Sequence, residues 1–371
     1  MIAAGPAQRS IAVVDGGSFV LPYDFQLVKA LSERGARVVF HGSRTRYNGE
    51  FLEAMSALAG VTVVSAGVSG TVSPRWRGVP AYAWLLLRLL RHRAAFDAVN
   101  VQFSAFWPLE LPVLCLLRHK LLFTVHNAVP HGFAGQQHRP TRWIASMAQS
   151  LVFVSEATRD DFMQRYGEGF RAKASVVPHG LLPTAPELGP LAYALREPPQ
   201  SLVFWSRVKP YKGVELLVPL ARSPRVRARS LSLAVYGAWD PQLHPLRREL
   251  RDLDVHIHDT YLDRDALQAL LAKEAVFLLP YRDASQSGAL YSLLNHGCRF
   301  ICADVGDMGA FMRRFGLEGL LLKDRSVDAV LACLDHLQAH EEDVTQAFQK
   351  AQDACRWDRL IEQHGQPYGI S

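Results

Sequence analysis

The chain has 371 residues, of which 49% are hydrophobic and 20% charged, a composition typical of a folded protein and not of a disordered one. A chain of this length rarely forms one hydrophobic core, so two domains are expected. Residues 1–185 carry 19 Lys and Arg against 11 Asp and Glu, whereas residues 186–371 carry 22 against 24. The basic first half favours anionic partners, although a merely solubilising surface is the alternative.

Nothing in the sequence predicts export, a membrane span or a zinc site. The N-terminus shows no secretory signal, and the longest apolar stretch, 79–90, is short and broken by Arg88. The five cysteines are scattered, and Cys298 and Cys302 lack a second pair to complete a zinc site. We therefore expect a cytoplasmic chain with reduced thiols and no metal.

Apolar strand-like runs alternate with amphipathic stretches along the chain. The first half has a predicted helix at 24–35 and predicted strands at 10–15, 36–42, 61–67, 98–103, 120–127 and 150–156. The second half has predicted strands at 201–206, 232–237, 255–259, 275–281 and 299–304, and a helix at 347–365. Continuous apolar strands that alternate with helices predict parallel sheets covered on both faces.

A segment rich in Pro and Gly, residues 178–200, separates the two series and has a linker composition. The sequence therefore predicts an α/β protein with two Rossmann-like domains facing a cleft, residues 1–182 and 190–354. Ligands are expected at the carboxyl ends of the strands. One large doubly wound domain is the alternative.

Three cations follow the first strand of the second half. In SRVKPYKG, residues 206–213, these are Arg207, Lys209 and Lys212, and Gly213 opens the next helix-like stretch. A diphosphate needs cations and a closely approaching backbone, and a strand end beside a helix start offers both. An ordinary basic loop is the alternative.

A second candidate anion site lies in LLPYRDASQSGALYSLLNHG, residues 278–297. A strand ends at Pro280, and Ser285 or Ser287 could cap the helix that follows. The amides of Ser287, Gly288 and Ala289 would then point at an anion, with the helix dipole adding to the attraction. An ordinary capped helix is the alternative.

These two motifs and two others resemble, in order, the retaining GT-B glycosyltransferases of the family 4 type. SRVKPYKG resembles the phosphate loop, and the segment with SQSG resembles a variant of the donor site. FTVHNAVPH (123–131) resembles the acceptor-side loop, and VVPHG (176–180) the entry to the linker. The resemblance implies a nucleotide-diphosphate sugar in the second domain, an acceptor in the first, and a final helix, about 355–371, that returns to the first domain.

The resemblance also implies roles for single residues. Arg207 and Lys212 would neutralise the departing diphosphate without a metal or other cofactor, and His126 would touch the transferred sugar. The remaining donor-site residues would be Lys209, Gln286, Ser287, Gly288, Ala289 and Ser292. The acceptor side would use Gly16, Gly17, Asn127 and His131. Apart from the resemblance, Asp24 is expected to cap the helix after the glycines. Surface histidines are the alternative for His126 and His131.

One feature of the family is missing. Its members usually carry two glutamates eight residues apart, and the second, which holds the ribose, falls here at Ser292 or Leu293. The chain is therefore either a glycosyltransferase or an inactive binder of glycan or nucleotide at a membrane or synthase complex. A nucleotide-sugar epimerase would need a pair of cleft carboxylates, which the sequence does not place. No hydrolase or nucleic-acid motif is present, and His256 and His258 lack a third metal ligand.

A basic, aromatic stretch at 75–93 includes Trp76, Tyr82 and Trp84 among five arginines. Such a stretch can lie in a membrane interface. A core helix with a cationic outer face is the alternative. With the resemblance, this predicts transfer with retention to a glycan or polyprenyl-linked acceptor, in polysaccharide or glycolipid assembly, with peripheral contact at the cytoplasmic membrane face.

Overall fold

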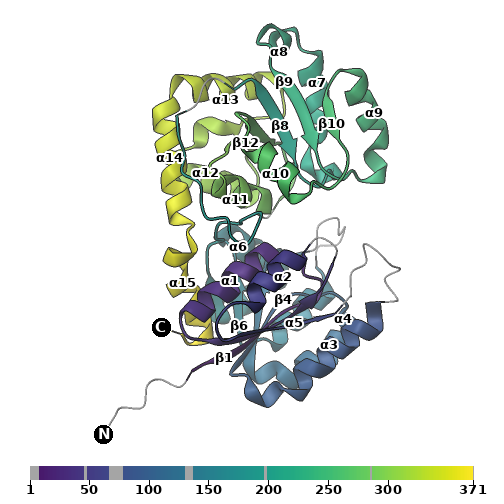
Figure 1. Cartoon of the computed structure of the whole chain (residues 1–371), viewed down its shortest axis with the longest axis vertical. Helices are drawn as coiled ribbons and strands as arrows, with labels where there is room; N and C mark the ends of the chain where they lie inside the picture. Colours follow the sequence, from purple (N-terminus) through teal and green to yellow (C-terminus); the bar gives the residue numbers. More distant parts are fainter. Residues whose placement is uncertain are drawn as a thin grey trace. The chain divides into compact units, whose positions relative to one another are not determined.

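The computed structural model describes residues 8–45, 48–66, 78–129, 137–195, 199–284 and 286–370 (Figure 1). The chain divides into two compact units. Unit 1 comprises Met1–Gly180 with Cys355–Ser371, and unit 2 comprises Leu181–Ala354. Each unit has its own parallel sheet, so the alternative of one large doubly wound domain is wrong.

The sheet of unit 1 has seven strands in the order β3-β2-β1-β4-β5-β6-β7, and every pair is parallel. Six of them match the predicted apolar runs closely, which confirms the strand–helix reading. The seventh, β7, has only three residues, too few for a pattern to reveal it. The strands are β1 (Ser10–Asp15), β2 (Arg37–Ser43), β3 (Val61–Ala66), β4 (Ala98–Phe103), β5 (Leu121–Val125), β6 (Ser150–Phe153) and β7 (Ala174–Val176).

Helices cover both faces of this sheet. One continuous core joins alternate residues of β1, β4, β5 and β6 to the buried sides of α3 (Val79–Arg91), α4 (Trp107–Leu117), α5 (Arg139–Met147) and α6 (Glu156–Tyr166). Figure 1 shows α1 (Leu21–Glu33) and α2 (Gly49–Ser56) on the opposite face from α3 and α4. Helix α1 begins three residues before Asp24, with Val20 at its N-cap, so the prediction that Asp24 caps it is wrong.

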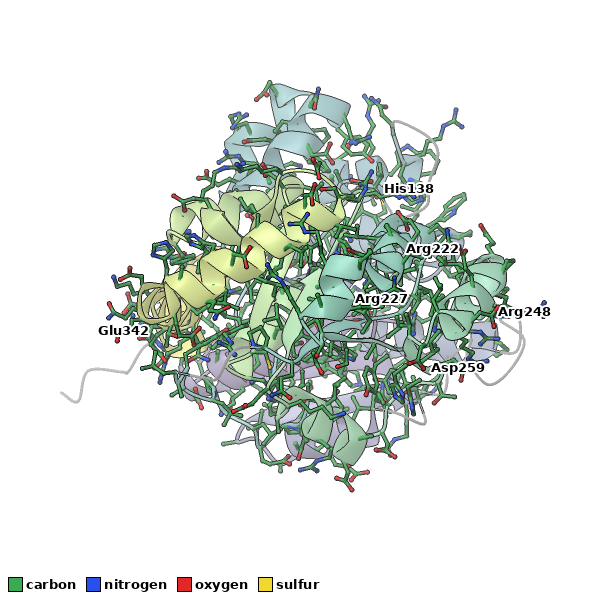
Figure 2. The ribbon with its side chains drawn as sticks, turned by 90° about the horizontal axis from the view of Figure 1, so that it is seen from above. His138, Arg222, Arg227, Arg248, Asp259 and Glu342 are labelled. Atoms are coloured by element: carbon green, nitrogen blue, oxygen red, sulfur yellow. The ribbon has the colours of Figure 1, made fainter. Side chains whose placement is uncertain are left out.

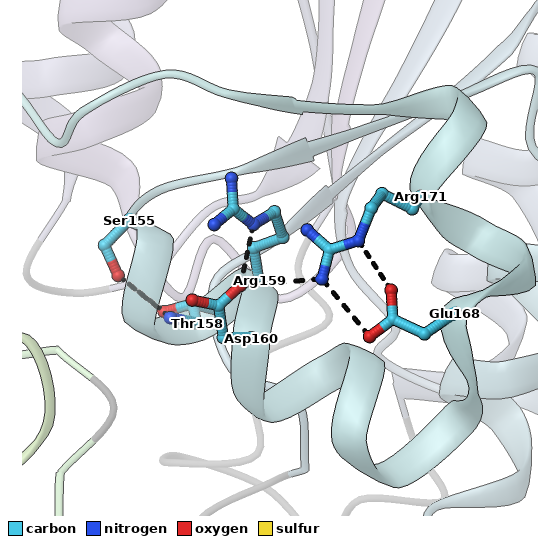
Figure 3. Close-up of polar contacts among 6 residues, drawn as sticks. All are labelled: Ser155, Thr158, Arg159, Asp160, Glu168 and Arg171. Atoms are coloured by element: carbon cyan, nitrogen blue, oxygen red, sulfur yellow. Dashed lines mark hydrogen bonds and ion pairs between the residues drawn. The ribbon is translucent and has the colours of Figure 1, made fainter.

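The start of α6 shows what Ser155 does. Its hydroxyl accepts a hydrogen bond from the backbone N–H of Thr158 at 3.1 Å, as an N-cap residue does (Figure 3). Farther along, the Nε of Arg171 lies 2.5 Å from the Oε2 of Glu168, and the two residues form an ion pair. The Nη2 of Arg171 lies 4.0 Å from the Oδ1 of Asp160. These contacts stabilise the local structure around α6.

Unit 2 has six parallel strands in the order β10-β9-β8-β11-β12-β13. They are β8 (Ser201–Trp205), β9 (Ser232–Tyr236), β10 (His256–His258), β11 (Val276–Leu279), β12 (Arg299–Ala303) and β13 (Leu321–Leu322). The two-residue β13 was not predicted. The helices are α7 (Leu217–Arg222), α8 (Pro224–Ala228), α9 (His244–Asp252), α10 (Arg264–Leu271), α11 (Gly288–Asn295), α12 (Gly306–Arg314), α13 (Val327–Ala339) and α14 (Glu341–Ala354).

The predicted helix at 347–365 is two helices. Helix α14 ends at Ala354, Arg356 adopts an extended conformation, and α15 (Trp357–Gly365) then packs within unit 1. The ring of Trp357 lies 5.2 Å from that of Tyr23 in α1, and a Cβ on Gly180 would overlap Trp357. Aromatic packing therefore fixes this last helix on the first unit.

Candidate functional site

In each sheet the strand order reverses between two neighbouring strands, β1 and β4 in unit 1 and β8 and β11 in unit 2. Parallel α/β sheets bind ligands outside the carboxyl ends of the strands at such a switch point. Both predicted anion-binding motifs follow the switch strands of unit 2: the loop 206–213 follows β8, and residues 280–289 follow β11.

Backbone contacts fix the loop 206–213. The N–H of Val208 donates to the carbonyl of Ala238 at 2.9 Å, and its own carbonyl accepts from Asp240 at 2.9 Å. Gly213 has φ +70°, and a Cβ there would collide with the carbonyl of Pro280. A glycine is therefore required where this loop packs against the end of β11.

Lys212 points toward the second motif. Its Nζ donates to the hydroxyl of Ser206 and, at 3.2 Å, to the hydroxyl of Tyr281, and it lies 4.8 Å from the centre of the Tyr281 ring. The Ser287 hydroxyl is 3.4 Å from the same tyrosine oxygen. Tyr281 thus links the basic loop to the start of α11. Sequence reasoning missed it, although its place directly after the strand-ending Pro280 was a signal.

Arg207 is exposed and Lys209 half-buried, and within the described parts of the chain neither takes part in a hydrogen bond or ion pair. Two other arginines of unit 2 form ion pairs. Arg222, labelled in Figure 2, lies 2.8 Å from Glu249, and Arg282 lies 2.5 Å from Glu215. The charge of Arg207 is therefore not neutralised by a described neighbour.

The start of α11 is not capped by a side chain. Ser287 occupies the N-cap with extended backbone, but its hydroxyl makes no cap hydrogen bond, which corrects the expectation for this serine; Ser285 lies outside the described residues. The first-turn amides of Gly288 and Ala289 are left for another acceptor. Beside them, the Oε1 of Gln286 is buried without a partner among the described residues.

Helix α11 also decides between the two positions of the missing glutamate. Leu293 is fully buried in the core, whereas Ser292 is half-buried. Of the two, only Ser292 has a side chain that can reach a solute, and it would supply a hydroxyl in place of the carboxylate that the resemblance implies.

In unit 1, His126 is a buried ring, 1% exposed, and neither a surface histidine nor an open contact point. Its Nε2 lies 2.8 Å from Oε1 of Gln102, and its ring stacks on Phe103 at 4.7 Å. Burial lowers the pKa of His126 to about 3, so the ring is neutral. Its neighbour Asn127 is half-buried, and His131 lies outside the described residues.

The two glycines after β1 serve packing. A Cβ on Gly16 would overlap the ring of Tyr82, and a Cβ on Gly17 would overlap the ring of Phe19. Packing within unit 1 therefore explains why glycine is required at both positions. We had expected these glycines to let the backbone approach a ligand.

Two carboxyl groups that the sequence did not bring together, Asp15 and Asp24, are buried beside this loop. Burial raises the pKa of Asp15 to about 6, and burial with the neighbouring Asp15 charge raises the pKa of Asp24 well above its usual range. Burial of two neighbouring carboxyl groups disfavours a negative charge on both. Both residues are 0% exposed, so the pair does not serve as the acid/base pair that an epimerase would need at its substrate.

Among the described residues, no group of three or more His, Cys, Asp or Glu is arranged to hold a metal ion. His256 and His258 instead lie against the ring of Tyr236, at 5.4 and 5.9 Å. Within the same residues, no helix is long and apolar enough to cross a membrane.

Comparisons with known proteins agree with this arrangement. Residues 24–183 match the family model of Glycosyltransferase Family 4, and residues 199–340 match that of glycosyl transferases group 1. A GDP-mannose:glycolipid 4-beta-D-mannosyltransferase from Xanthomonas campestris pv. campestris is 25% identical over 260 residues, which cover 68% of this chain and 69% of the relative.

Solved structures share the fold over nearly the whole chain. Anabaena Alr3699/HepE in complex with UDP has a TM-score of 0.65 at 13% identity, covering 98% of this chain and 99% of that one. Sucrose-phosphate synthase from Thermosynechococcus elongatus has a TM-score of 0.68 at 15% identity, covering 98% of both chains.

The two matched domains and the two parallel sheets make this chain a glycosyltransferase of the GT-B class. The Family 4 match lies mainly in its first unit, and the group 1 match lies in its second unit.

Proposed function

We propose that the chain transfers a sugar from a nucleotide-diphosphate sugar to a glycan or lipid-linked acceptor, without a metal or other cofactor, in polysaccharide or glycolipid assembly. One observation carries the proposal. At the switch point of unit 2, Lys212, Tyr281 and Ser287 are connected. In the same region are Arg207, which has no partner among the described residues, and the start of α11, which no described side chain caps.

This arrangement suits the chemistry of a departing diphosphate. When the bond between the anomeric carbon and the diphosphate oxygen breaks, negative charge grows on the phosphates. Fixed cations and backbone N–H groups, already oriented before the reaction, stabilise that charge most effectively. In our proposal Arg207 and Lys212 act on the leaving group together with the amides of Gly288 and Ala289, and Lys209 adds a further cation.

For the nucleoside, we propose that polar groups replace the missing glutamate. Ser292 is placed to donate to the ribose, and the unpartnered Oε1 of Gln286 can accept from a donor hydroxyl. The relatives' names suggest two bases, since one takes GDP-mannose and another was crystallised with UDP. A thermal-shift panel of GDP-, UDP- and ADP-sugars tests this, because a bound ligand raises the apparent stability.

We propose retention of the anomeric configuration. In a same-face attack the leaving phosphate takes the acceptor's proton, so no carboxylate base is required. The buried Asp15 and Asp24 fit that scheme because neither is exposed to an acceptor. The Xanthomonas relative is named for a β-mannosyl product, so the anomeric signal of the product must be measured. An α product from an α-linked donor supports retention, and a β product refutes it.

On the acceptor side we propose that unit 1 contributes Asn127, His131 and the loop with Gly16 and Gly17. Burial of His126 does not support a direct contact with the sugar, so we assign it a supporting role beside Asn127. We propose that the exposed side of α3 touches the inner face of the membrane, where a lipid-linked acceptor would be found.

The second candidate is an inactive glycan or nucleotide binder, favoured by the absent glutamates. Release of nucleoside diphosphate from purified protein, donor and a crude glycolipid acceptor separates the two. Acceptor-dependent release supports a transferase. Donor binding without any release supports the binder and contradicts our proposal.

A further inference from the structure

Helix α4 has an unusual distribution of charge. Its sequence, WPLELPVLCLL, contains a single residue of the charged types Asp, Glu, Lys and Arg, namely Glu110, which is 2% exposed. The Glu110 carboxylate accepts hydrogen bonds from the Tyr82 hydroxyl at 2.5 Å and from the N–H groups of Ala105 and Phe106 at 2.6 and 2.9 Å. The one charge of the helix is therefore used internally.

The outward side of α4 is apolar. Beyond Trp107, its exposed residues are Pro108, Pro112, Cys115 and Leu116, at the spacing of one helical stripe, and Leu116 is 65% exposed. Helices on the surface of globular proteins normally place polar residues on this stripe. An all-apolar outer stripe indicates that something other than water covers it.

A ring contact joins this stripe to α5, and α3 packs on the same core. The rings of Trp107 and Trp143 meet edge to face at 5.7 Å, which joins α4 to α5. Helix α3 packs on the same core and exposes Trp84 and Leu87. Of the large hydrophobic residues exposed in the described chain, six lie on or just before these helices, and we name them the α3–α5 surface: Trp84, Leu87, Phe106, Trp107, Leu116 and Trp143.

Cations accompany the apolar residues. Seven lie on these helices or the turns that follow them, and none forms an ion pair within the described residues: Arg88, Arg91, Arg93, Arg118, Lys120, Arg139 and Arg142. The guanidinium of Arg88 lies over Trp84, 5.2 Å from the ring centre. The described carboxylates of this stretch are Glu110, which is buried, and Asp97, which accepts from the N–H of Ser10.

We infer that the α3–α5 surface binds an anionic lipid bilayer, with α4 and Trp143 at its centre and the arginines toward the headgroups. Tryptophan beside arginines that form no ion pair with a described residue favours lipid over a protein partner, because indole rings lie at the headgroup level and each cation adds attraction to anionic lipid. The inference rests on the proposed function, because the purpose of the membrane contact would be access to a lipid-linked acceptor. It adds α4 and α5 to the membrane contact that we propose for α3. Binding itself is measurable without catalysis.

The test is flotation of the purified full chain with vesicles of phosphatidylcholine alone and with added phosphatidylglycerol. We expect binding to the anionic vesicles, weakened by high salt. The double variant Arg139→Glu with Arg142→Glu should lose roughly 30-fold or more in partition, at about tenfold per 1.4 kcal/mol and about 1 kcal/mol for each cation removed. The double variant Leu116→Gln with Trp143→Ser should also float poorly.

Matched controls come from unit 2, where Leu195 is 61% exposed and Arg227 and Arg248 lie on surface helices (Figure 2). Leu195→Gln, and Arg227→Glu with Arg248→Glu, should float as the wild type does. No flotation of the wild type, or equal losses in both sets, overturns the inference. So does concentration-dependent self-association that the α4–α5 variants abolish without any vesicle binding.

Release of nucleoside diphosphate to a soluble acceptor fragment separates this inference from the proposed function. Variants of the α3–α5 surface that still release nucleoside diphosphate but no longer float with vesicles support both the inference and the proposed function. A wild-type chain that floats with anionic vesicles but releases no nucleoside diphosphate, while the surface variants float poorly, refutes the proposed function alone.

Discussion

Substitution of Lys212 by methionine removes one proposed stabiliser of the leaving diphosphate while keeping the length of the side chain. If its ammonium behaves as a preorganised donor, its loss costs about 2.7–4 kcal/mol of transition-state stabilisation, or roughly a hundredfold to a thousandfold in kcat. The structure adds a cost in stability, because Lys212 donates to Ser206 and Tyr281. Two hydrogen bonds at about 0.5–1.5 kcal/mol each lower the thermal midpoint by a few degrees in a domain of this size.

Arg207→Ala is the matched comparison. Arg207 is exposed and has no partner among the described residues, so its removal should lower kcat similarly and leave the thermal midpoint unchanged. Initial rates of nucleoside diphosphate release, with melting curves of the same preparations, give both quantities. Wild-type turnover in Lys212→Met and in Arg207→Ala would refute the role that we assign to the loop.

Three further predictions concern groups that the structure brought to light. Tyr281→Phe removes the hydroxyl between Lys212 and Ser287 and should weaken donor binding about two- to tenfold by calorimetry; unchanged affinity would show that the link is incidental. The Nη1 of the buried Arg299 lies 2.8 Å from both carboxylate oxygens of Glu341. Glu341→Ala removes this carboxylate and should lower the free energy of unfolding, measured in urea, by about 3–5 kcal/mol. A cost below about 1 kcal/mol would contradict this. Burial lowers the pKa of His364 to about 3, so its contribution to stability is present above the ordinary pKa of 6.5 and is lost as the pH falls below it. His364→Phe should therefore recover about 2 kcal/mol of the stability that the wild type loses between about pH 6.5 and pH 5, and equal pH slopes would contradict this.

The sequence predicted the sheets well because their strands are continuous apolar runs, such as Ala98–Phe103, which matches β4 residue for residue. It failed at β7 and β13, which have three and two residues and depend on pairing with a neighbour. It also joined α14 to α15, because the break at Arg356 contains no Pro or Gly.

For the site, sequence reasoning identified the two motifs and could not identify what connects them. The contact of Tyr281 with Lys212 joins residues 69 apart and exists only because β8 and β11 are neighbours in the sheet. The pair of Asp15 and Asp24 was missed for a related reason. Asp24 follows a predicted loop and was taken for a helix cap, whereas α1 starts earlier and turns its side chain into the core.

The most direct test of the diphosphate site is the backbone amide NMR spectrum of the deuterated chain during titration with GDP and with UDP. Our account predicts that the nucleotide that binds shifts the amides of Gly288 and Ala289 most strongly, together with those of residues 207–209 and 211–213. Saturable binding that leaves these amides unmoved, with the large shifts confined to unit 1, would contradict it.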